Sequence, residues 1–420
     1  MLDRTTPPPS KTIGRFHLSW PQAYQVKEKL PLFVLDTGSQ PVIKLELICD
    51  AGSWYEPHNG VARFTAKMLR ECTQDKSAQD IAHHIDQYGA SVQIQVRPDT
   101  CTFTLTTLSK HLTPMLDLLA ELLLAPAFAE QRLEHLKHLT TQTLKVEAKK
   151  NSHVVRKKFK ELLFGETHPY GRQLTEAAIA DITTRHLKQY YKNQLLSNCR
   201  ILVSGRVTEQ DLQTITRHLQ SLPTKAQGNP LPSWPTQAPD QIHWAKKESL
   251  QTAINMGNVL VTKEHPDYLP LLVVNELLGG YFGSRLMRNI REEKGYTYGI
   301  FSQIVPLRHT SYLLIATEVI QAFAEATCQE IEKEIKALQT TPITEEELKT
   351  LQNYMLGSFL AESNDPFSVM KKFKAAYLHG LTQAHYDQYY DTIMHISAPQ
   401  IMALANEYLS VSSLSQVTVG

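Results

Sequence analysis

The first candidate for a chemical site is the stretch "NGVARFTAKMLREC", residues 59–72, whose apolar spacing predicts a helix. Arg63 and Lys67 stand four residues apart in it, so their side chains share one helix face, next to Ala66. An arginine keeps its proton in proteins and a lysine has an ordinary pKa of about 10, so neither side chain is a metal ligand at neutral pH. Two alternatives stay open: a grip on the carboxylates or carbonyls of a peptide, and a solvated helix face.

Two pairs of histidines are the next candidates. His135 and His138 are three residues apart on a predicted helix, a spacing that can hold a metal, and His83 adjoins His84. Neither pair has a cysteine or a carboxylate at a recognisable metal-ligand distance along the chain. We therefore interpret both pairs as surface or interface histidines.

A second charged stretch, "NELLGGYFGSRLMRNIREEKGYTYG", covers residues 275–299. Its Gly-rich turn has neither the lysine nor the spacing of a phosphate-binding loop, so nucleotide binding gets little support. Gly279 and Gly280 are expected to end a helix with left-handed or close-packed backbone. The charges that follow suit ordinary intrahelical ion pairs, such as Arg288 with Glu292.

The length and the charge of the chain limit its class. With 420 residues, 42% of them hydrophobic, the chain is long enough for two domains of typical size. Its 43 Lys and Arg residues nearly cancel its 42 Asp and Glu residues, so the overall field favours neither nucleic acid nor an anionic membrane as a partner. The most apolar segment, "LDLLAELLLAPAF", contains Asp117 and Glu121 and is too short and too charged to span a bilayer.

The N-terminal segment and the cysteines predict a cytoplasmic protein. The first twenty residues, "MLDRTTPPPSKTIGRFHLSW", are polar and lack the apolar core of a secretory signal. The cysteines are odd in number, widely spaced and form no CxxC pair, which fits buried thiols in a reducing compartment rather than a disulfide framework or a zinc ribbon. They are Cys49, Cys72, Cys101, Cys199 and Cys328.

A proline-rich stretch near the midpoint, "LPTKAQGNPLPSWPTQAPDQ", predicts a linker between two halves, because proline interrupts helices and central strands. We predict domains at residues 1–222 and 242–420, joined by a linker over residues 223–241. Each half shows a strand, helices, a pair of alternating strands, and a long helix followed by a proline and a new helix start. This succession indicates a duplication into two related domains rather than a solenoid of short repeats.

The strand pairs are joined by short turns, which favours mainly antiparallel or mixed sheets. The helical segments between them need a sheet face to cover. The predicted fold class is therefore α+β, with two homologous α/β-sandwich domains, each a mainly antiparallel or mixed sheet with helices packed on one face.

Three segments carry a family resemblance: "DAGSWYEPHNGVARFTAKML" at residues 50–69, "ELLFGETHPYGR" at residues 161–172, and the stretch at residues 275–299. In this order they resemble the signature with an inverted zinc motif (HxxEH), the segment after the third zinc ligand, and the second-half signature of one family. That family is the insulinase and pitrilysin-like zinc metallopeptidases, which include the mitochondrial processing peptidase and core subunits of the respiratory cytochrome complex. The similarity runs over nearly the whole chain.

The zinc motif of that family is degenerate in this chain. In an HxxEH helix the two histidines hold the metal from one face, and the glutamate acts on the metal-bound water as general base. The resemblance places Arg63, Ala66 and Lys67 at these positions. The family's third ligand is a glutamate, and its register falls near Thr143 and Leu144.

The only carboxylate in that segment, "LTTQTLKVEAKKNS", is Glu147. The resemblance therefore implies no metal and no cofactor in this chain, and zinc only in a partner subunit.

The second-half signature is retained. The resemblance places Arg291 and Tyr298 on the family's substrate-binding arginine and tyrosine, seven residues apart with "EEKG" between them. In active members this pair lies opposite the zinc and contacts the substrate carbonyl, where donors aimed at developing negative charge stabilise the transition state. Tyr298 alone, on an alternating strand beginning "YTYGIF", is also compatible with simple packing.

Together these features imply a chain that keeps the fold without the metal. Some bacterial members, like the mitochondrial processing enzyme, are heterodimers in which one chain bears the zinc motif and the peptide is enclosed between both chains. We therefore expect a non-catalytic, substrate-binding subunit that has peptidase activity only with a zinc-bearing homologous subunit. Its expected ligands are peptides or unfolded segments, and a homodimer of the isolated chain stays open.

Two other functions compete with this hypothesis. On the same scaffold, a purely structural or interaction protein would resemble the family's respiratory-complex core subunits, but it would have no need of Arg291 and Tyr298. An independent hydrolase with a relocated site is the third alternative, and the sequence offers neither a GxSxG motif nor a Cys/His context for it.

Overall fold

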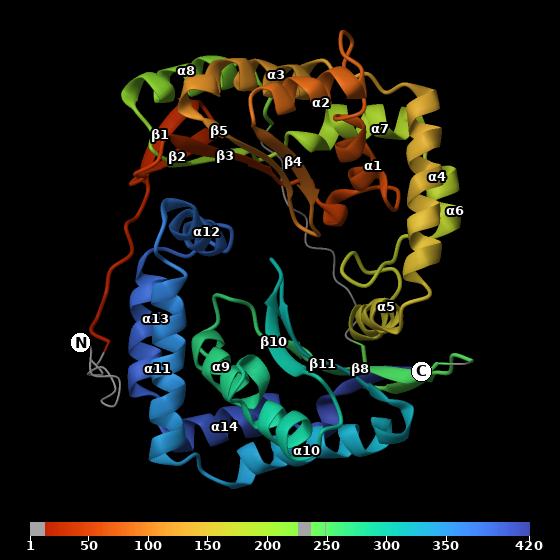
Figure 1. Cartoon of the computed structure of the whole chain (residues 1–420), viewed down its shortest axis with the longest axis vertical. Coiled ribbons are helices and arrows are strands. Elements are labelled where there is room, and N and C mark those ends of the chain that lie inside the picture. The colour runs from red at the N-terminus through yellow and green to blue at the C-terminus, as the bar shows by residue number, and fades with distance from the viewer. Residues whose placement is uncertain (1–12, 226–236, 248) are drawn as a thin grey trace, which may run out of the picture.

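The computed structural model describes residues 13–225, 237–247 and 249–420 (Figure 1). Its elements form two layered halves, each with one mixed sheet and with helices on the side of the sheet that faces away from the other half. The two sheets face one another across the middle of the molecule. The predicted α+β class with two mixed sheets is thereby confirmed.

The sheet of the first half has the order β1-β2-β6-β3-β5-β4, with β2 and β6 parallel and the other neighbours antiparallel. Its strands are β1 (Gln22–Lys27), β2 (Leu30–Asp36), β3 (Val42–Cys49), β4 (Ser91–Val96), β5 (Cys101–Leu108) and β6 (Arg200–Gly205). The helices are α1 (Val61–Met68), α2 (Ala78–Gln87), α3 (Leu112–Leu124), α4 (Glu130–Glu147), α5 (Asn151–Phe164), α6 (Glu176–Asp181), α7 (Thr184–Tyr190) and α8 (Glu209–Leu219).

The sheet of the second half has the order β7-β12-β8-β11-β10, and β9 pairs with β11. This repeats the order β2-β6-β3-β5-β4, including the single parallel pair, β7 with β12. The strands are β7 (Gln241–Trp244), β8 (Gln251–Gly257), β9 (Val259–Leu260), β10 (Ile300–Pro306), β11 (Ser311–Ile320) and β12 (Ser415–Val419). The α-helices are α9 (Tyr268–Asn275), α10 (Ala324–Thr340), α11 (Glu345–Ala361), α12 (Pro366–Tyr377), α13 (Ala384–His395) and α14 (Ala398–Tyr408), with π-helical turns η4 (Glu276–Gly280) and η5 (Met287–Glu293).

Side-chain patterns explain the central strands. Along β5, "CTFTLTTL", buried and half-buried residues alternate, so Phe103 and Leu105 enter the core between the sheet and its helices. β6, "RILVSG", is buried throughout, because Ile201 and Val203 face that core while Leu202 is covered by a helix of the other half. A fully apolar strand of this kind indicates cover on both faces.

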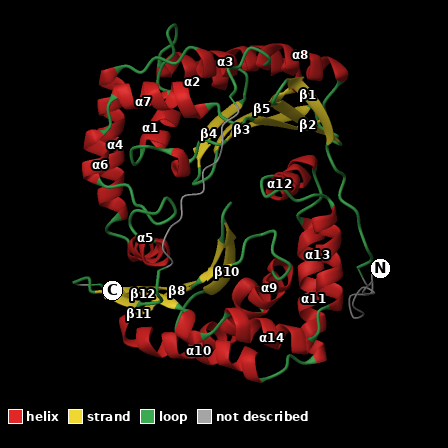
Figure 2. Cartoon of the chain, turned by 180° about the vertical axis from the view of Figure 1, so that it is seen from behind, coloured by secondary structure: helices red, strands yellow, loops and turns green. Residues whose placement is uncertain are grey.

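The halves exchange one helix each (Figure 2). α12 of the second half lies on the inner face of the first sheet, where Met370 and Phe373 share a buried cluster with Leu35 and Leu202. This contact buries apolar side chains of both halves together. Part of the inner face of the first sheet is therefore covered by α12, a helix of the second half.

The reciprocal contact is made by α5 of the first half, which lies on the second sheet. Val155 and Phe159 of this helix share a buried cluster with Ala253, Leu314 and Val417. α5 follows directly after the long helix α4, as α12 follows α11 in the second half. The exchange thus repeats the internal duplication.

The turn between β10 and β11 ties the halves together with charge. Arg308 donates from Nη2 to Asp50 Oδ1 (2.9 Å) and from Nη1 to the Tyr55 hydroxyl (2.7 Å). Asp50 also accepts from Arg200 Nη2 at 2.7 Å. Burial raises the pKa of Asp50, but the hydrogen bond from Arg308 and the charge of Arg200 outweigh it, and the pKa lies below its usual value.

One cysteine expectation was wrong. Cys49 and Cys199 form a disulfide with their Cα atoms 4.3 Å apart. The antiparallel register of β3 and β6 sets Ile48 opposite Arg200, which brings the two adjoining cysteines face to face. A contact of residues so far apart in the chain leaves no trace in cysteine spacing. Cys101 and Cys328 are free and buried, as expected.

Parts of two predictions lie outside the described residues. Residues 1–12 of the polar N-terminal segment and residues 226–236 of the proposed linker belong to this group. β7 begins at Gln241, and the domain division at residues 1–222, 223–241 and 242–420 stays a prediction. No helix in the described ranges is long and apolar enough to cross a bilayer.

Candidate functional site

α1 is fixed at its N-terminus by a buried carboxylate. Gly60, with a left-handed φ of 91°, precedes the helix, and Glu56 accepts hydrogen bonds from the backbone N–H groups of Gly60 (3.0 Å) and Ala62 (3.1 Å). Arg172 pairs with the same carboxylate at 3.1 Å. An anion at this end of a helix interacts favourably with its dipole. The helix that carries the degenerate zinc positions is therefore rigidly placed.

The three degenerate positions have different surroundings. Ala66 is only 3% exposed and belongs to the core of the first half, whereas Arg63 is exposed. Lys67 donates from Nζ to the Thr140 hydroxyl of α4 at 3.4 Å. Desolvation lowers the pKa of Lys67, and the charge of Arg63 lowers it further. The face of α1 that looks toward α4 thus holds a lysine ammonium.

The expected third-ligand region gives no carboxylate to this face. Thr143 donates to the Leu139 carbonyl of its own helix (2.9 Å), and Leu144 packs against the first core. Glu147 lies at the end of α4, 3.1 Å from His153 Nε2. Within the described ranges no three His, Cys, Asp or Glu residues gather into a metal-binding group. An arginine, an alanine and a lysine do not fit zinc, so no step is derived through a metal here.

The second-half pair lies at the surface. Arg291, on η5, stacks its guanidinium over the exposed ring of Phe282 at 4.5 Å and makes no ion pair with a described residue. Tyr298 is 97% exposed. β10 begins at Ile300, so the strand start expected at Tyr296, the first residue of "YTYGIF", was wrong. Tyr298 lies before the strand and does not pack on the sheet.

The expected ion pair of Arg288 with Glu292 is absent among the described contacts, where Arg288 reaches the Gly283 carbonyl instead (3.4 Å). Wider π-helical turns put residues five apart in register rather than four, which removes the geometry that this pairing needs. Gly279 and Gly280 have close-packed rather than left-handed backbone: a Cβ on Gly279 would lie 2.8 Å from the Ser302 nitrogen.

Tyr298 lines a cavity of about 690 Å³ between α5 and the inner face of the second sheet. Arg156 and Lys160 of α5 line the same cavity. These two cations are not among the site residues predicted from the sequence, although the run "VVRKKFK" at residues 154–160 indicates a basic helix. Arg291 is not among the lining residues, so the cavity joins Tyr298 to α5 rather than to Arg291.

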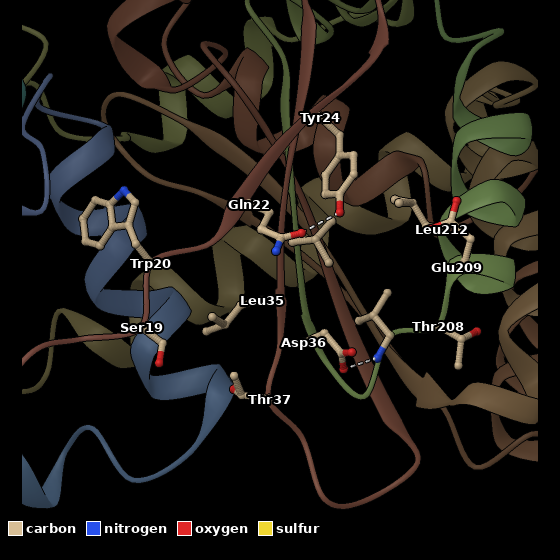
Figure 3. Close-up of a pocket in the computed structure, with 12 residues that line it drawn as sticks. Ser19, Trp20, Gln22, Tyr24, Leu35, Asp36, Thr37, Thr208, Glu209 and Leu212 are labelled. Atoms are coloured by element: carbon tan, nitrogen blue, oxygen red, sulfur yellow. Dashed lines mark hydrogen bonds between the residues drawn. The ribbon is translucent and has the colours of Figure 1, made fainter.

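A further cavity of about 400 Å³ lies away from these residues, between β1, β2 and the start of α8 (Figure 3). Its carboxylate Asp36 accepts from the Val207 backbone N–H at 2.9 Å, and Tyr24 donates to Gln22 Oε1 at 2.7 Å. These polar groups are engaged with the protein itself. The cavity contains none of the predicted site residues.

The fold and the site define a two-part α+β scaffold of metallopeptidase shape whose zinc positions hold no zinc ligands. Family comparisons agree in both halves: "Insulinase (Peptidase family M16)" matches residues 33–177, and "Peptidase M16 inactive domain" matches residues 181–355. The chain belongs to the insulinase family of peptidases, M16, as a member that lacks the zinc motif.

Relatives and solved structures are consistent with this assignment. The chain is 24% identical over 319 residues to the "Uncharacterized zinc protease YmxG" of Bacillus subtilis, covering 75% of this chain and 77% of that protein. It is 25% identical over 342 residues to the "Non-peptidase homolog YmxG" of Helicobacter pylori, covering 79% and 78%. The fold matches a peptidase M16 inactive domain from Pseudomonas fluorescens with a TM-score of 0.86 and 23% identity, over 95% of this chain and 98% of that one.

A protease from Helicobacter pylori has the same fold, with a TM-score of 0.86 and 18% identity over 95% of this chain and 100% of that one. Both structural likenesses concern the fold. The family matches and the non-peptidase relative from Helicobacter pylori are consistent with a non-catalytic role on the peptidase scaffold.

Proposed function

We propose that this chain is the non-catalytic, substrate-binding subunit of a heterodimeric insulinase-type metallopeptidase. It encloses peptides or unfolded segments together with a zinc-bearing homologous subunit. Arg291 and Tyr298 then serve the partner's zinc site, where a guanidinium and a phenol donate hydrogen bonds to the substrate carbonyl as it gains negative charge. The zinc ion, when bound in the partner, supplies the activated water.

The observation that carries the proposal is the contrast between the two signatures. The positions of the zinc motif are occupied by Arg63, Ala66 and Lys67. In the second signature, Arg291 has no anionic partner among the described residues, and Tyr298 is exposed to solvent, so both side chains can donate hydrogen bonds to a ligand. A protein that served only as a scaffold would gain nothing from an exposed tyrosine and an unpaired arginine.

The test is co-expression with a zinc-motif homologue from the same source and turnover of a fluorogenic peptide library. The chain alone is expected to be inactive. In the complex, Arg291→Ala or Tyr298→Phe should lower kcat by about a hundredfold, the usual effect of losing one oxyanion donor. Arg288→Ala, on the same turn as Arg291, and Tyr24→Phe, an exposed tyrosine on β1, are the matched controls.

Unchanged rates in both site variants would refute the proposed role of the pair. A stable complex without any peptide cleavage would instead assign the chain to the structural class of the family. Stable assembly is measured by size-exclusion chromatography, which also reports whether the isolated chain forms a homodimer.

The proposal includes a cytoplasmic location. Cys101 and Cys328 are free thiols, whereas a disulfide such as Cys49–Cys199 is typical of an oxidising compartment. The Cys49–Cys199 bridge provides the test. After cell lysis with acid trapping of thiols, alkylation and mass spectrometry should find the chain in the cytoplasmic fraction, with Cys49 and Cys199 largely reduced. Recovery from an extracytoplasmic fraction with the bridge intact would contradict this location.

A further inference from the structure

The cavity beside Tyr298 has a mixed lining. Its wall is α5, which the buried cluster around Phe159 holds on the second sheet. Its floor is the inner face of β8, β10 and β11, where Phe301 is 48% exposed beside Leu314 and Ala316. This floor offers a surface for an apolar side chain, because aromatic and aliphatic groups gain by leaving water.

The wall carries charge without a counter-ion. Arg156 and Lys160 stand four residues apart on α5 and both line the cavity. Neither makes an ion pair or a side-chain hydrogen bond with any residue in the described ranges. Lys160 is half-buried, and its pKa is lowered first by burial and then by the charge of Arg156. A half-buried cation gains most when an anion is brought to it, because the surroundings screen the pair less than water does.

Among the described residues that line the cavity, the one carboxylate is Glu318, and no ion pair joins it to these two cations. It also lines a second hollow, of about 740 Å³, which begins at the N-terminus of α5 and shares Ser152 and Gln251 with the first. The cations of this second hollow are Lys149, Lys150, Lys246 and Lys247. A basic track therefore follows α5 and ends at Tyr298.

We propose that this track binds an acidic segment of an extended peptide, with aspartate or glutamate side chains paired to Arg156 and Lys160 and an apolar side chain on Phe301. The inference rests on the proposed function in so far as the ligand is a peptide, and it adds the class of peptide. Bound in this way, the segment leads its backbone to Tyr298. An arginine and a lysine together suit carboxylates, which the planar guanidinium binds with two parallel hydrogen bonds.

Nucleic acid is the competing polyanion, and the observations favour peptide. The chain has 43 basic and 42 acidic residues, so it has no general basic surface, and α5, which carries Arg156 and Lys160, lies between the two sheets (Figure 1). The exposed aromatic rings of the cavity lining are Phe301 on the floor and Tyr298 at the end, whereas proteins that bind single strands stack successive bases on a row of aromatic rings.

The experiment measures binding of fluorescein-labelled peptides to the purified full chain by fluorescence anisotropy. The probes are a Glu/Leu-containing twelve-residue peptide, chosen as roughly the length that spans such a track at about 3.3 Å per residue, and the same peptide with Gln for Glu. The acidic peptide is expected to bind at least about tenfold more tightly, and its affinity should fall as salt rises.

The variant Arg156→Gln with Lys160→Gln should abolish this preference, lowering affinity for the acidic peptide by about tenfold or more and leaving that for the Gln peptide unchanged. The control, Lys333→Gln with Lys336→Gln on the outer helix α10, removes the same charge from exposed positions and should bind like the unaltered chain. Circular dichroism melting verifies that both variants fold.

Equal binding of both peptides, or equal loss in both variants, would overturn the proposal. Tighter binding of a single-stranded oligonucleotide than of the acidic peptide would assign the track to phosphates and overturn it as well. Because the assay needs no partner subunit, its failure is separate from failure of the proposed function. In the heterodimer, the variant Arg156→Gln with Lys160→Gln should still cleave neutral peptides, and this cleavage should still be lowered by Tyr298→Phe.

Discussion

At the scale of the residue, the degenerate zinc positions show what a substitution does to a site. In an HxxEH helix a zinc ion would hold two histidine side chains at positions 63 and 67. In this chain Ala66 joins the core instead, and Lys67 donates to Thr140. Burial of small apolar side chains and one weak hydrogen bond thus replace metal coordination. The helix keeps its position because Glu56 and the core hold it, and neither depends on the lost ligands.

A buried carboxyl elsewhere provides a stability prediction. Burial raises the pKa of Glu276, on η4, to about 7, and the charge of Glu362 adds to the effect. The folded chain therefore holds a proton that the unfolded chain releases above its ordinary pKa of about 4.3, so this contribution is complete at low pH and is lost as pH rises through about 7.

At pH 8 the free energy of unfolding of Glu276→Gln should accordingly exceed that of the unaltered chain by about 2 kcal/mol, which urea unfolding measures. At pH 4 the two proteins should be equally stable. Glu346→Gln, an exposed position on α11, should change little at either pH. A Gln variant that is less stable at pH 8 would mean that the Glu276 carboxylate is stabilised in a way that burial does not describe.

The sequence was informative about residues whose meaning depends on local spacing. Arg63 and Lys67 could be excluded as ligands from their side-chain chemistry alone. Arg156 and Lys160 could not be recognised, because they become a site only when α5 crosses the sheet of the other half. Neither residue has a neighbour in sequence that indicates this.

At the scale of the element, the periodic patterns predicted most strands and helices. The two alternating strand pairs became β4 with β5 and β10 with β11, because an alternating segment can bury only one face. What failed were features set by tertiary contact: the π-helical turns of η4 and η5, and the late start of β10. Gly279 illustrates why, since a Cβ there would lie 2.8 Å from the backbone nitrogen of Ser302 on β10.

The exchange of α5 and α12 has a physical basis in the patterns of these helices. α12 buries Val369, Met370 and Phe373 along one stripe, and α5 buries Val155, Phe159 and Leu163 along another. Each stripe needs an apolar partner surface, and the outer face of each sheet is already covered by other helices. The remaining sheet surfaces are the inner faces of the two halves. The sequence cannot specify which inner face each helix covers, because both sheets have similar strands.

At the scale of the whole molecule, the two halves therefore pack on one another and are not separate units. The duplicated strand order makes the halves alike, while the exchanged helices and the Arg308 contacts make them interdependent. In the proposed peptide complex, the basic track along α5 with Tyr298 at its end is already formed in the folded chain. Affinity then requires little reordering of the protein.

The Arg308 contacts give the last prediction. Removing this side chain leaves Asp50 buried with Arg200 as its only guanidinium partner among the described residues, so Arg308→Ala should lower the free energy of unfolding by about 3 kcal/mol at pH 7. The folded pKa of Asp50 lies below its unfolded value, so the contribution of the pair is complete above about pH 4 and is lost as pH falls through the folded pKa.

Urea unfolding at pH 7 and pH 3 measures both effects. The stability difference between Arg308→Ala and the unaltered chain should be large at pH 7 and smaller at pH 3, because the contribution of the pair declines as pH falls toward the lowered folded pKa of Asp50. The control Arg217→Ala, an exposed arginine on α8, should leave stability nearly unchanged. A difference that persists unaltered at pH 3 would show that Arg308 acts through packing of its stem rather than through the Asp50 charge, and that the halves are held together chiefly by α5 and α12.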